Sequence, residues 1–327
     1  MNIVITGAGG FIGSHLGRWF MDHTDHLVTG VDLVEPQHMD ARAVANEFQH
    51  ADMRDPYQAK FVLRKADLVF ALAANMGGMG FIGNKANDLD VLVDNALINL
   101  NTVRALALFG RAKHVVFSSS ACVYNETLQD EVGAPPLSEG DAYPAQPDTV
   151  YGWEKLFGEI VYQALGRRGM TMAHIVRFHN IYGPEGTWQG GREKAPAALC
   201  RKVAEAKRDG GREIEIWGDG EQTRSFCYID DCVRGLVALS ESDLVEPVNL
   251  GTSRDVSINE LADIIMRVAG FDGTKKHVEG IQGVRGRNAD LSMIAERLGW
   301  VPEVGLERGL EYTYRWIEDQ VVSCNYT

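Results

Sequence analysis

The sequence predicts an α/β protein: a doubly wound parallel, Rossmann-type sheet joined to a smaller mixed α/β domain. Two observations predict this fold class. In the first half of the chain, short apolar runs alternate with helical patterns, and a glycine-rich turn follows the first run. In the second half, a Gly- and Pro-rich segment interrupts this alternation before it returns. We therefore expect two interleaved domains, one from residues 1–178 and about 225–255, the other from about 179–224 and 256–327.

The expected elements follow each other as βαβ units. Each early strand is a short, continuous apolar run, as in a buried parallel sheet, and a stretch with helical spacing follows it. The first expected strands are Asn2–Thr6, Leu27–Val31, Leu68–Ala73 and His114–Ser118, with helices at 11–20, Pro56–Arg64 and Leu89–Phe109. The later expected elements are a strand at Ile175–Arg177, a helix at Ala195–Lys207, a strand at Glu213–Trp217 and a last sheet strand at Pro247–Gly251.

Composition and charge disfavour several classes of protein. With 327 residues, 45% of them hydrophobic, the chain can bury a substantial core. Its five cysteines form no Cys-x-x-Cys motif, which argues against disulfide stapling and against a metal site. A net charge of −13 disfavours a nucleic-acid partner. The first residues lack a signal-peptide pattern and we expect no apolar run of membrane-spanning length, so we expect a cytoplasmic protein without a membrane partner.

The loop after the first strand is typical of a dinucleotide site. Its glycines follow the spacing G-x-x-G-x-x-G. Glycines let the backbone approach a pyrophosphate, whose charge is met by the N-terminus of the following helix. The simpler alternative is a tight strand-to-helix turn without a ligand. The expected cofactor contacts in this loop are Gly7, Gly9, Gly10, Phe11, Ile12 and Gly13.

Two acidic residues define the expected cofactor further. Asp32 follows the second predicted strand, where a carboxylate accepts hydrogen bonds from an adenosine ribose and repels a 2′-phosphate, so NAD is favoured over NADP. Asp52 follows the next strand-like run and could meet the adenine amino group, although a lone surface acid is an equally good interpretation. Ala73, at the end of the third predicted strand, is also expected beside the cofactor.

Tyr151 and Lys155 lie four residues apart and share one face of a predicted helix. Tyrosine, with a pKa near ~10, is a poor base at neutral pH, but a lysine ammonium and a positively charged nicotinamide can lower that pKa by stabilising the phenolate. The alternative is an ordinary exposed helical pair. Ser119 or Ser120, after the fourth predicted strand, is expected to hydrogen-bond a substrate hydroxyl.

Cys122 adds a second acid/base group that simple oxidoreduction does not need. Its position directly after the serine run favours a functional thiol. The other cysteines, Cys200, Cys227, Cys232 and Cys324, are expected to be small buried hydrophobic residues.

These motifs resemble the extended short-chain dehydrogenase/reductase family of sugar-nucleotide enzymes. The glycine loop, the serines and the Tyr151 to Lys155 string carry the resemblance to the family as a whole. Longer strings, over nearly the whole chain, resemble the GDP-mannose 3,5-epimerases within it. Asn125 stands where these enzymes usually have proline, and residues 206–212 are a few positions longer than their pattern. The strings are Ala73–Gly80, Ser120–Cys122, Arg177–Pro184, Gly190–Ala198, Trp217–Phe226 and Gly283–Asn288.

The resemblance implies an isomerase that inverts C3 and C5 of GDP-mannose. Oxidising C4 to a ketone makes the hydrogens on C3 and C5 acidic, so each carbon can lose a proton and give an enolate. Tyr151 would take the C4 hydroxyl proton, with Lys155 and Ser120 supporting it, and NAD would be needed but not consumed. Inversion requires proton removal on one face of the sugar and delivery on the other, and Cys122 and Lys194 are implied for these roles. A solvated surface charge is the alternative for Lys194.

The resemblance also implies which residues hold a GDP-hexose. Arginine suits bidentate contacts to a diphosphate, and Arg285 could take that role instead of Arg287 or could form an ion pair. Glu193 is a candidate for orienting Lys194, and His179 is expected to be structural. The implied substrate contacts are Gly80, Ser120, Ala121, Cys122, Asn180, Glu193, Lys194, Ala195, Lys202, Gln222, Thr223, Arg224 and Arg287.

A homodimer is implied as well, with exposed apolar helix faces between Leu89 and Phe109 as a contact surface. Other functions stay open. A C4 epimerase needs only a hydroxyl donor where Cys122 stands, and a 4,6-dehydratase needs an acidic pair at this point. An enzyme with a 4-keto intermediate acting on a different nucleotide sugar is harder to separate. A non-catalytic NAD-binding regulatory protein is expected to lack the Tyr, Lys or Cys, and all three are present.

Overall fold

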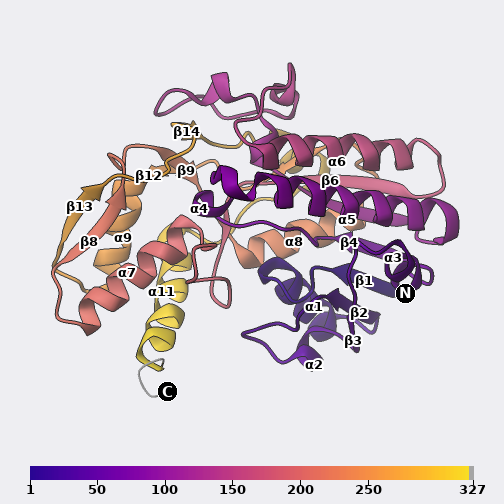
Figure 1. Ribbon diagram of the computed structural model, residues 1–327, viewed down its shortest axis with the longest axis horizontal. Helices are drawn as coiled ribbons and strands as arrows, with labels where there is room; N and C mark the ends of the chain where they lie inside the picture. The colour runs from indigo at the N-terminus through magenta and orange to yellow at the C-terminus, as the bar shows by residue number, and fades with distance from the viewer. Residues whose placement is uncertain (324–327) are drawn as a thin grey trace.

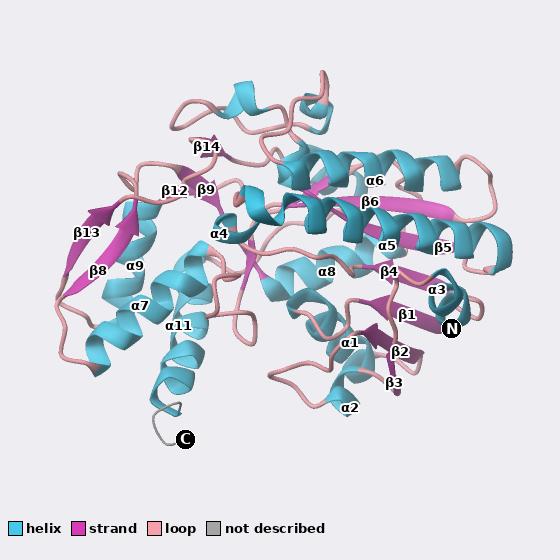
Figure 2. Cartoon of the chain, in the orientation of Figure 1, coloured by secondary structure: helices cyan, strands magenta, loops and turns pink. Residues whose placement is uncertain are grey.

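The computed structural model describes residues 1–323 and has a seven-stranded parallel sheet at its centre (Figures 1 and 2). The strand order is β11-β6-β5-β4-β1-β2-β3, so the chain winds outward in both directions from β1. This arrangement confirms the predicted fold class. Cys324, expected to be buried, lies outside the described residues. The strands are β1 (Asn2–Thr6), β2 (Leu27–Asp32), β3 (Glu47–His50), β4 (Leu68–Ala71), β5 (His114–Ser120), β6 (Met172–Phe178) and β11 (Val248–Leu250).

Helices cover both faces of this sheet, because alternate side chains of each buried strand point to opposite sides. In β1, Ile3 and Ile5 pack into one core cluster and Val4 into another. On one face α5 packs against α3 and α6, and on the other α1 packs against α2 and α8 (Figure 1). These helices are α1 (Phe11–His23), α2 (Ala41–Val44), α3 (Pro56–Leu63), α5 (Asp88–Phe109), α6 (Val150–Gly166) and α8 (Ile229–Ser240).

A second group of elements lies beyond the carboxyl ends of the strands. Helices α7, α9 and α11 pack together and against two small sheets, β13-β8 and β12-β9-β14 (Figure 1). Its helices are α7 (Ala195–Arg208), α9 (Ile258–Ala269) and α11 (Leu306–Ser323). Its strands are β8 (Glu213–Trp217), β9 (Thr223–Ser225), β12 (Asp255–Ser257), β13 (Thr274–Val278) and β14 (Gly286–Arg287).

Short elements connect these two groups. Strand β7 pairs with β10, and α10 packs against β11. Because β11 pairs with β6, the chain returns to the large sheet after it has built part of the second group. The domain boundaries drawn from the sequence stay a prediction. The connecting elements are α4 (Met79–Ile82), β7 (Ile181–Tyr182), β10 (Cys227–Tyr228), α10 (Ser292–Leu298), and the 3-10 turns η1 (Lys85–Asn87), η2 (Ala121–Val123), η3 (Glu126–Gln129) and η4 (Glu139–Ala142).

Helix α5 corrects one expectation. Residues Lys85–Phe109, which comprise η1 and α5, form 25 helical residues that contain an 18-residue window with a mean hydropathy of 1.2, long and apolar enough to cross a membrane by length and composition. The expectation that no apolar run approaches that length was therefore wrong. The helix nevertheless buries polar side chains against its neighbours, Asn95, Asn99 and Thr102 among them. Such burial is typical of a helix that flanks a sheet.

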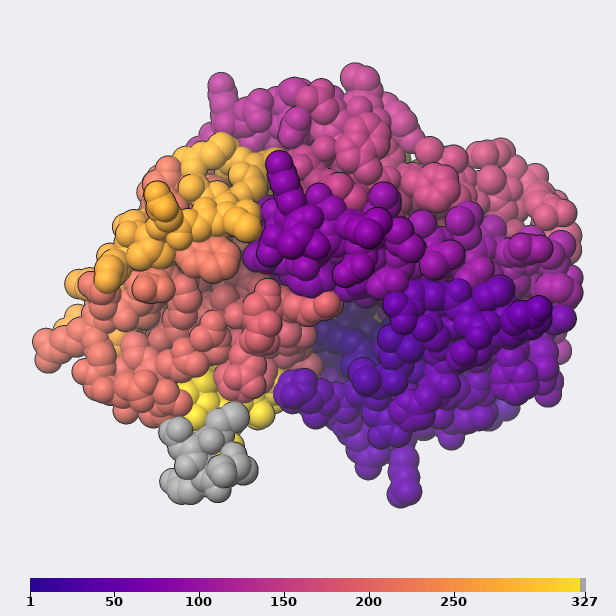
Figure 3. All heavy atoms as spheres, in the orientation of Figure 1, coloured from indigo at the N-terminus to yellow at the C-terminus, as the bar shows by residue number. Residues whose placement is uncertain are grey.

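Several strands of the large sheet end at one edge, which faces the second group. The glycine loop, Asp32, the segment after β4, the serines of β5 and Asn180 all follow or end these parallel strands. Ligands of doubly wound sheets bind at this edge. In Figure 3 the surface is hollowed where the indigo N-terminal part meets the salmon segment that includes the start of α7.

Candidate active site

The glycine loop is packed too tightly to accept side chains. A Cβ added to Gly13 would lie 2.1 Å from the carbonyl oxygen of Gly7, and one added to Gly9 would lie 2.1 Å from that of Val34. Gly10 caps helix α1, whose first turn receives no hydrogen bond from a capping side chain. The loop therefore presents backbone N–H groups at a helix N-terminus, which fits the pyrophosphate of a dinucleotide.

Asp32 lies against this loop. Its carboxylate accepts hydrogen bonds from the amides of Gly9 (3.0 Å) and Leu33 (2.7 Å). Burial raises the pKa of Asp32, while these backbone donors lower it. A half-buried carboxylate at the end of β2 fits the ribose of an adenosine. Ala73 also lies beside the loop, because a Cβ on Gly7 would meet its amide nitrogen at 2.8 Å.

Asp52 has protein partners of its own. Arg54 donates to it through Nε (2.9 Å) and Nη2 (2.8 Å), and the same guanidinium donates to Asp94 at 2.9 Å. These bonds hold the pKa of Asp52 below its usual value. The predicted adenine contact would have to share this carboxylate with Arg54.

Tyr151 and Lys155 lie at the start of α6, close to Cys122. Thr149 caps the helix by accepting a bond from the Gly152 amide, and a Cβ on Gly152 would lie 2.1 Å from the carbonyl oxygen of Cys122. This close approach brings Tyr151 beside the thiol. Lys155 lies behind the tyrosine: its Nζ donates to the Ser118 carbonyl at 2.8 Å and lies 5.7 Å from the centre of the Tyr151 ring.

The surroundings of Tyr151 raise its pKa. Burial raises it, the nearby Cys122 and Glu154 raise it further, and a hydrogen bond with Ser120 lowers it. The lowering expected from the sequence needs Lys155 together with a positively charged nicotinamide, and it stays a prediction for the cofactor-bound site. Burial also lowers the pKa of Lys155 itself, against the opposite effect of Glu154. The residue that sequence reasoning missed is Glu154, which lies inside the Tyr151 to Lys155 string.

Cys122 contacts a buried arginine. Nη1 of Arg287 lies 3.3 Å from the Cys122 sulfur, its Nε donates to Gln129 Oε1 at 2.5 Å, and its Nη2 lies 3.7 Å from Asp148. Burial lowers the pKa of Arg287, but Cys122 and Asp148 raise it, with a net upward shift. Ser120 accepts a bond from the Cys122 amide at 3.2 Å. Like Glu154, Gln129 and Asp148 carry no signal in the sequence that marks them as part of the site.

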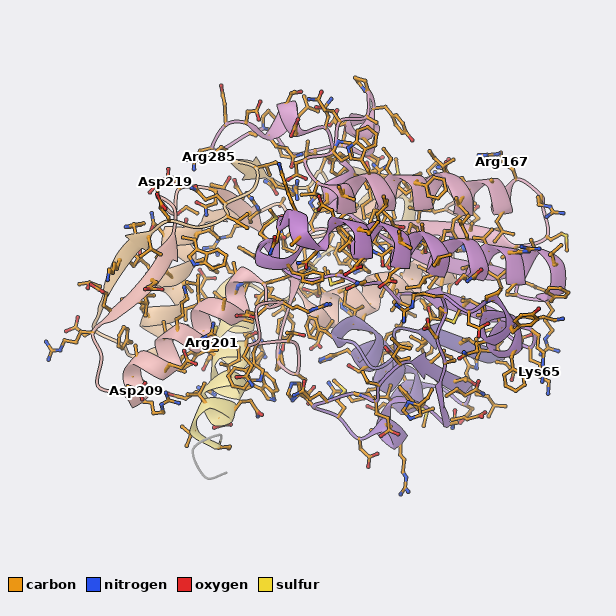
Figure 4. All side chains as sticks on the ribbon, viewed as in Figure 1. Lys65, Arg167, Arg201, Asp209, Asp219 and Arg285 are labelled. Atoms are coloured by element: carbon orange, nitrogen blue, oxygen red, sulfur yellow. The ribbon has the colours of Figure 1, made fainter. Side chains whose placement is uncertain are left out.

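Lys194 lies at the N-cap of α7 and lines the same pocket as Cys122 and Tyr151. Burial lowers its pKa, and Cys122 raises it. The Glu193 carboxylate is bonded elsewhere: it accepts from Arg201 Nη2 at 3.1 Å and from the Gly191 amide at 2.7 Å. Figure 4 shows Arg201 on helix α7.

Two arginines form the positive end of the pocket. Arg224 and Arg287 are paired across the parallel strands β9 and β14. Burial and the charge of Arg287 lower the pKa of Arg224 to about 9. The Oε1 atom of the neighbouring Gln222 is buried without a hydrogen-bond partner. Two buried guanidinium groups fit a diphosphate, which would offset the repulsion between the like charges, whereas the Gln222 oxygen is an acceptor and fits a donor such as a hydroxyl or an N–H group.

The structure places Lys202 and Asn180 at the pocket and pairs Arg285 with another side chain. Lys202 donates to the Glu215 carbonyl at 2.8 Å and lies 5.8 Å from the Trp217 ring, at the pocket wall. Arg285 forms an ion pair with Asp219 at 3.0 Å, and Figure 4 shows the two labelled together. This supports the ion-pair alternative for Arg285. Asn180 lines the pocket with a left-handed φ of 48°.

The structure brings most predicted substrate residues to one pocket. Lys155 and Thr223 are not part of its lining, and neither are the glycines of the cofactor loop. His179 is fully buried beside Asn249, and Cys200, Cys227 and Cys232 are fully buried too. Within residues 1–323, no group of three or more His, Cys, Asp or Glu side chains could hold a metal. The predicted residues that do line the pocket are Ile12, Gly80, Ser120, Ala121, Cys122, Tyr151, Asn180, Glu193, Lys194, Ala195, Lys202, Gln222, Arg224 and Arg287.

The chain is similar to known proteins over nearly its whole length. It is 44% identical over 321 residues to GDP-mannose 3,5-epimerase of Arabidopsis thaliana, an alignment that covers 98% of this chain and 83% of that protein. The crystal structure of UDP-glucose 4-epimerase from Thermotoga maritima with UDP-glucose superposes with a TM-score of 0.85 and 25% identity, covering 98% of this chain and all 100% of that one.

The structure of MoeE5 in complex with UDP-glucuronic acid and NAD superposes with a TM-score of 0.82 and 25% identity, over 98% of this chain and 100% of that chain. Residues 3–251 match the model of a family described as the NAD dependent epimerase/dehydratase family. The chain therefore belongs to the NAD dependent epimerase/dehydratase family.

Proposed function

We propose that the protein is an NAD-dependent isomerase that inverts C3 and C5 of GDP-mannose, giving GDP-L-galactose, GDP-L-gulose or both. The observation that carries this proposal is the pocket itself, where a tyrosine, a thiol and an amine from three separate segments meet. These groups are Tyr151, Cys122 and Lys194. The 44% identity to GDP-mannose 3,5-epimerase supports the choice of substrate.

Tyr151 is the group for the C4 hydroxyl. It takes that proton during oxidation of C4 and returns it during reduction, with the Ser120 hydroxyl bonded to its oxygen. When NAD is bound, its chemistry is the reversible exchange of a hydride with C4. Lys155, fixed on the Ser118 carbonyl, provides a positive charge near the phenol that favours loss of its proton.

Cys122 and Lys194 are the groups for C3 and C5. Once C4 is a ketone, each neighbouring carbon can lose its proton to one of them and regain a proton from the other face. The Arg287 guanidinium, 3.3 Å from the Cys122 sulfur, stabilises negative charge on that atom. Burial lowers the pKa of Lys194, so a larger fraction of its amine is neutral near pH 7, and therefore available to accept a proton, than in an exposed lysine.

The alternative is a C4 epimerase, or another enzyme with a 4-keto intermediate, acting on a different nucleotide sugar. The 4-epimerase likeness at 25% identity supports it. Inversion at C4 alone needs no acid or base at C3 and C5. The presence of both Cys122 and Lys194 in the pocket therefore favours the 3,5-epimerase.

Isotope exchange distinguishes the two functions. The purified protein, with NAD, is incubated with GDP-mannose in D2O, and deuterium at C3 and C5 is followed by NMR. We expect deuterium at both carbons and new galactose- or gulose-configured signals. If neither carbon exchanges while another nucleotide sugar is converted at C4, the alternative is correct.

We also propose that the protein acts in the cytoplasm as a homodimer. Helices α5 and α6 pack side by side and expose large apolar side chains (Figure 1). A second copy of the chain that supplies the same two helices would bury this surface in an isologous contact. The exposed side chains are Leu89, Leu92, Val93, Leu97 and Leu100 on α5 and Trp153, Phe157 and Ile160 on α6.

A further inference from the structure

We infer that Arg192 is a positioning residue that fixes the loop carrying Lys194 against the opposite wall of the pocket. The loop directly precedes helix α7. The opposite wall is formed by the segment between β4 and α4. The inference has a structural part, the contact itself, and a catalytic part, the placement of Lys194. The catalytic part rests on the proposed function.

The Arg192 side chain makes three contacts across the pocket mouth. Its guanidinium lies 3.8 Å from the centre of the Phe81 ring. Nη1 donates to Asn75 Oδ1 at 3.1 Å and to the Met76 carbonyl at 3.2 Å. The Asn75 side chain is itself held, because its Nδ2 donates to Asp94 Oδ2 at 3.1 Å. A cation over an aromatic ring and two charge-assisted hydrogen bonds favour one geometry of the guanidinium.

The backbone makes the same connection. The Gly78 amide donates to the Arg192 carbonyl at 2.9 Å. A Cβ on Gly78 would lie 2.3 Å from the carbonyl oxygen of Glu193, so only glycine permits this approach. The residue after Glu193 is Lys194. A displacement of this contact therefore moves the backbone of the proposed acid/base group directly.

The other residues of this loop make fewer contacts that hold it in place. Gly190 and Gly191 precede Arg192 with φ values of 90° and 84°, and a Cβ on either would meet no atom within 4 Å. The second support is the Glu193 side chain, bonded to Arg201. Arg192 is exposed, while Lys194 lines the same pocket as Cys122. Holding the loop in this place keeps Lys194 beside the sugar site.

Hydrogen exchange tests the structural part without substrate. Arg192→Met keeps an apolar stem over Phe81 but removes the donors. We expect amide exchange in peptides covering 75–83 and 188–194 to become about tenfold faster or more, because local opening becomes easier. The control is Arg254→Met, which removes a surface arginine paired with Glu307. Equal exchange in Arg192→Met and wild type overturns the inference.

Isotope exchange with GDP-mannose in D2O tests the catalytic part. In Arg192→Met we expect deuterium to enter both C3 and C5 about tenfold more slowly than in wild type, while C4 oxidation changes little. Arg192→Lys, which keeps a cation over Phe81, should recover part of the rate. A uniform loss at C3, C5 and C4 contradicts a role through Lys194.

A second variant acts on the same contact from the other side. Gly78→Ala pushes against Glu193, so it should slow the same exchange at C3 and C5, and combining it with Arg192→Met should add little. Additive effects overturn the inference. If wild type exchanges neither carbon but hydrogen exchange responds as expected, the proposed function fails while the structural part stands.

Discussion

Replacing Glu159 with glutamine tests the ion pair beneath the proposed active site. Arg177 and Glu159 are both about 2% exposed, and Arg177 Nη2 lies 2.7 Å from Glu159 Oε2. Glu159 also accepts from Arg177 Nε at 2.8 Å and from Ser119 Oγ at 2.5 Å. The Ser119 bond connects the pair to the end of β5, from which Ser120 and Cys122 follow.

The expected cost is large because the partner charge cannot reach water. Removing one member of a buried pair leaves the other uncompensated, which costs about 3–5 kcal/mol. At about 2.1 cal/mol/K per residue, the unfolding entropy of this 327-residue chain is roughly 0.7 kcal/mol/K, so each kcal/mol lowers Tm by about 1.5 °C and Glu159→Gln should lower Tm by about 4–7 °C. Glutamine keeps one acceptor oxygen for Arg177, which favours the lower half of this range.

Thermal unfolding followed by circular dichroism at pH 7 measures the effect. The matched control is Glu307→Gln, because Glu307 pairs with Arg254 at 2.9 Å while both side chains are 50% exposed. An exposed pair contributes about 0–1 kcal/mol, so this variant should unfold close to wild type. Removing both buried charges, in Glu159→Gln/Arg177→Met, should recover stability relative to Glu159→Gln alone. Equal losses in the Glu159 and Glu307 variants would refute the reasoning.

Four further outcomes follow from the site and the fold. Cys122→Ser should abolish inversion at the sugar while leaving NAD binding, measured by calorimetry, intact; inversion at the wild-type rate would show that the thiol role is wrong. Tyr151→Phe should stop C4 oxidation, seen as loss of nicotinamide reduction at 340 nm in the first turnover. Burial lowers the pKa values of His15 and His179 to about 3. The unfolded chain therefore binds more protons between pH 3 and 6.5, so urea titrations should give a free energy of unfolding that falls as pH falls, by roughly 2 kcal/mol per histidine between pH 6.5 and 5. Leu97→Asp should give a monomer in light scattering, and an unchanged dimer would place the contact elsewhere.

The fold could be predicted because its signals are local. A buried parallel strand is a short apolar run and its helix has a 3.6-residue period, so β1, β2, β4 and β5 stand out in the sequence. The predicted return of Pro247–Gly251 to the sheet agrees with the pairing of β11 and β6. Strand β3, Glu47–His50, was named only as strand-like, because an edge strand of polar residues has little apolar signal.

Partners distant in sequence could not be predicted in this way. Gln129 and Asp148 hold Arg287, yet Gln129 is separated from it by 158 positions and neither belongs to a periodic pattern. Asp52 is a different case, because its partner Arg54 is only two positions away. The distant contact is that of the same guanidinium with Asp94 on α5, 40 positions from Arg54.

The pKa of Tyr151 shows why a motif does not fix the chemistry of its residues. The motif predicts a phenol pKa that Lys155 and a positively charged nicotinamide lower together, but Glu154 also lies between Tyr151 and Lys155 and acts on both. Its charge raises the pKa of Tyr151 and also that of Lys155, which burial would otherwise lower further. The carboxylate that disfavours the phenolate therefore also helps to keep the lysine charged. Asn99 on α5 donates to Glu154 at 2.7 Å and holds its carboxylate inward. The pKa values of Tyr151 and Lys155 therefore depend on a helix that precedes the motif in the chain.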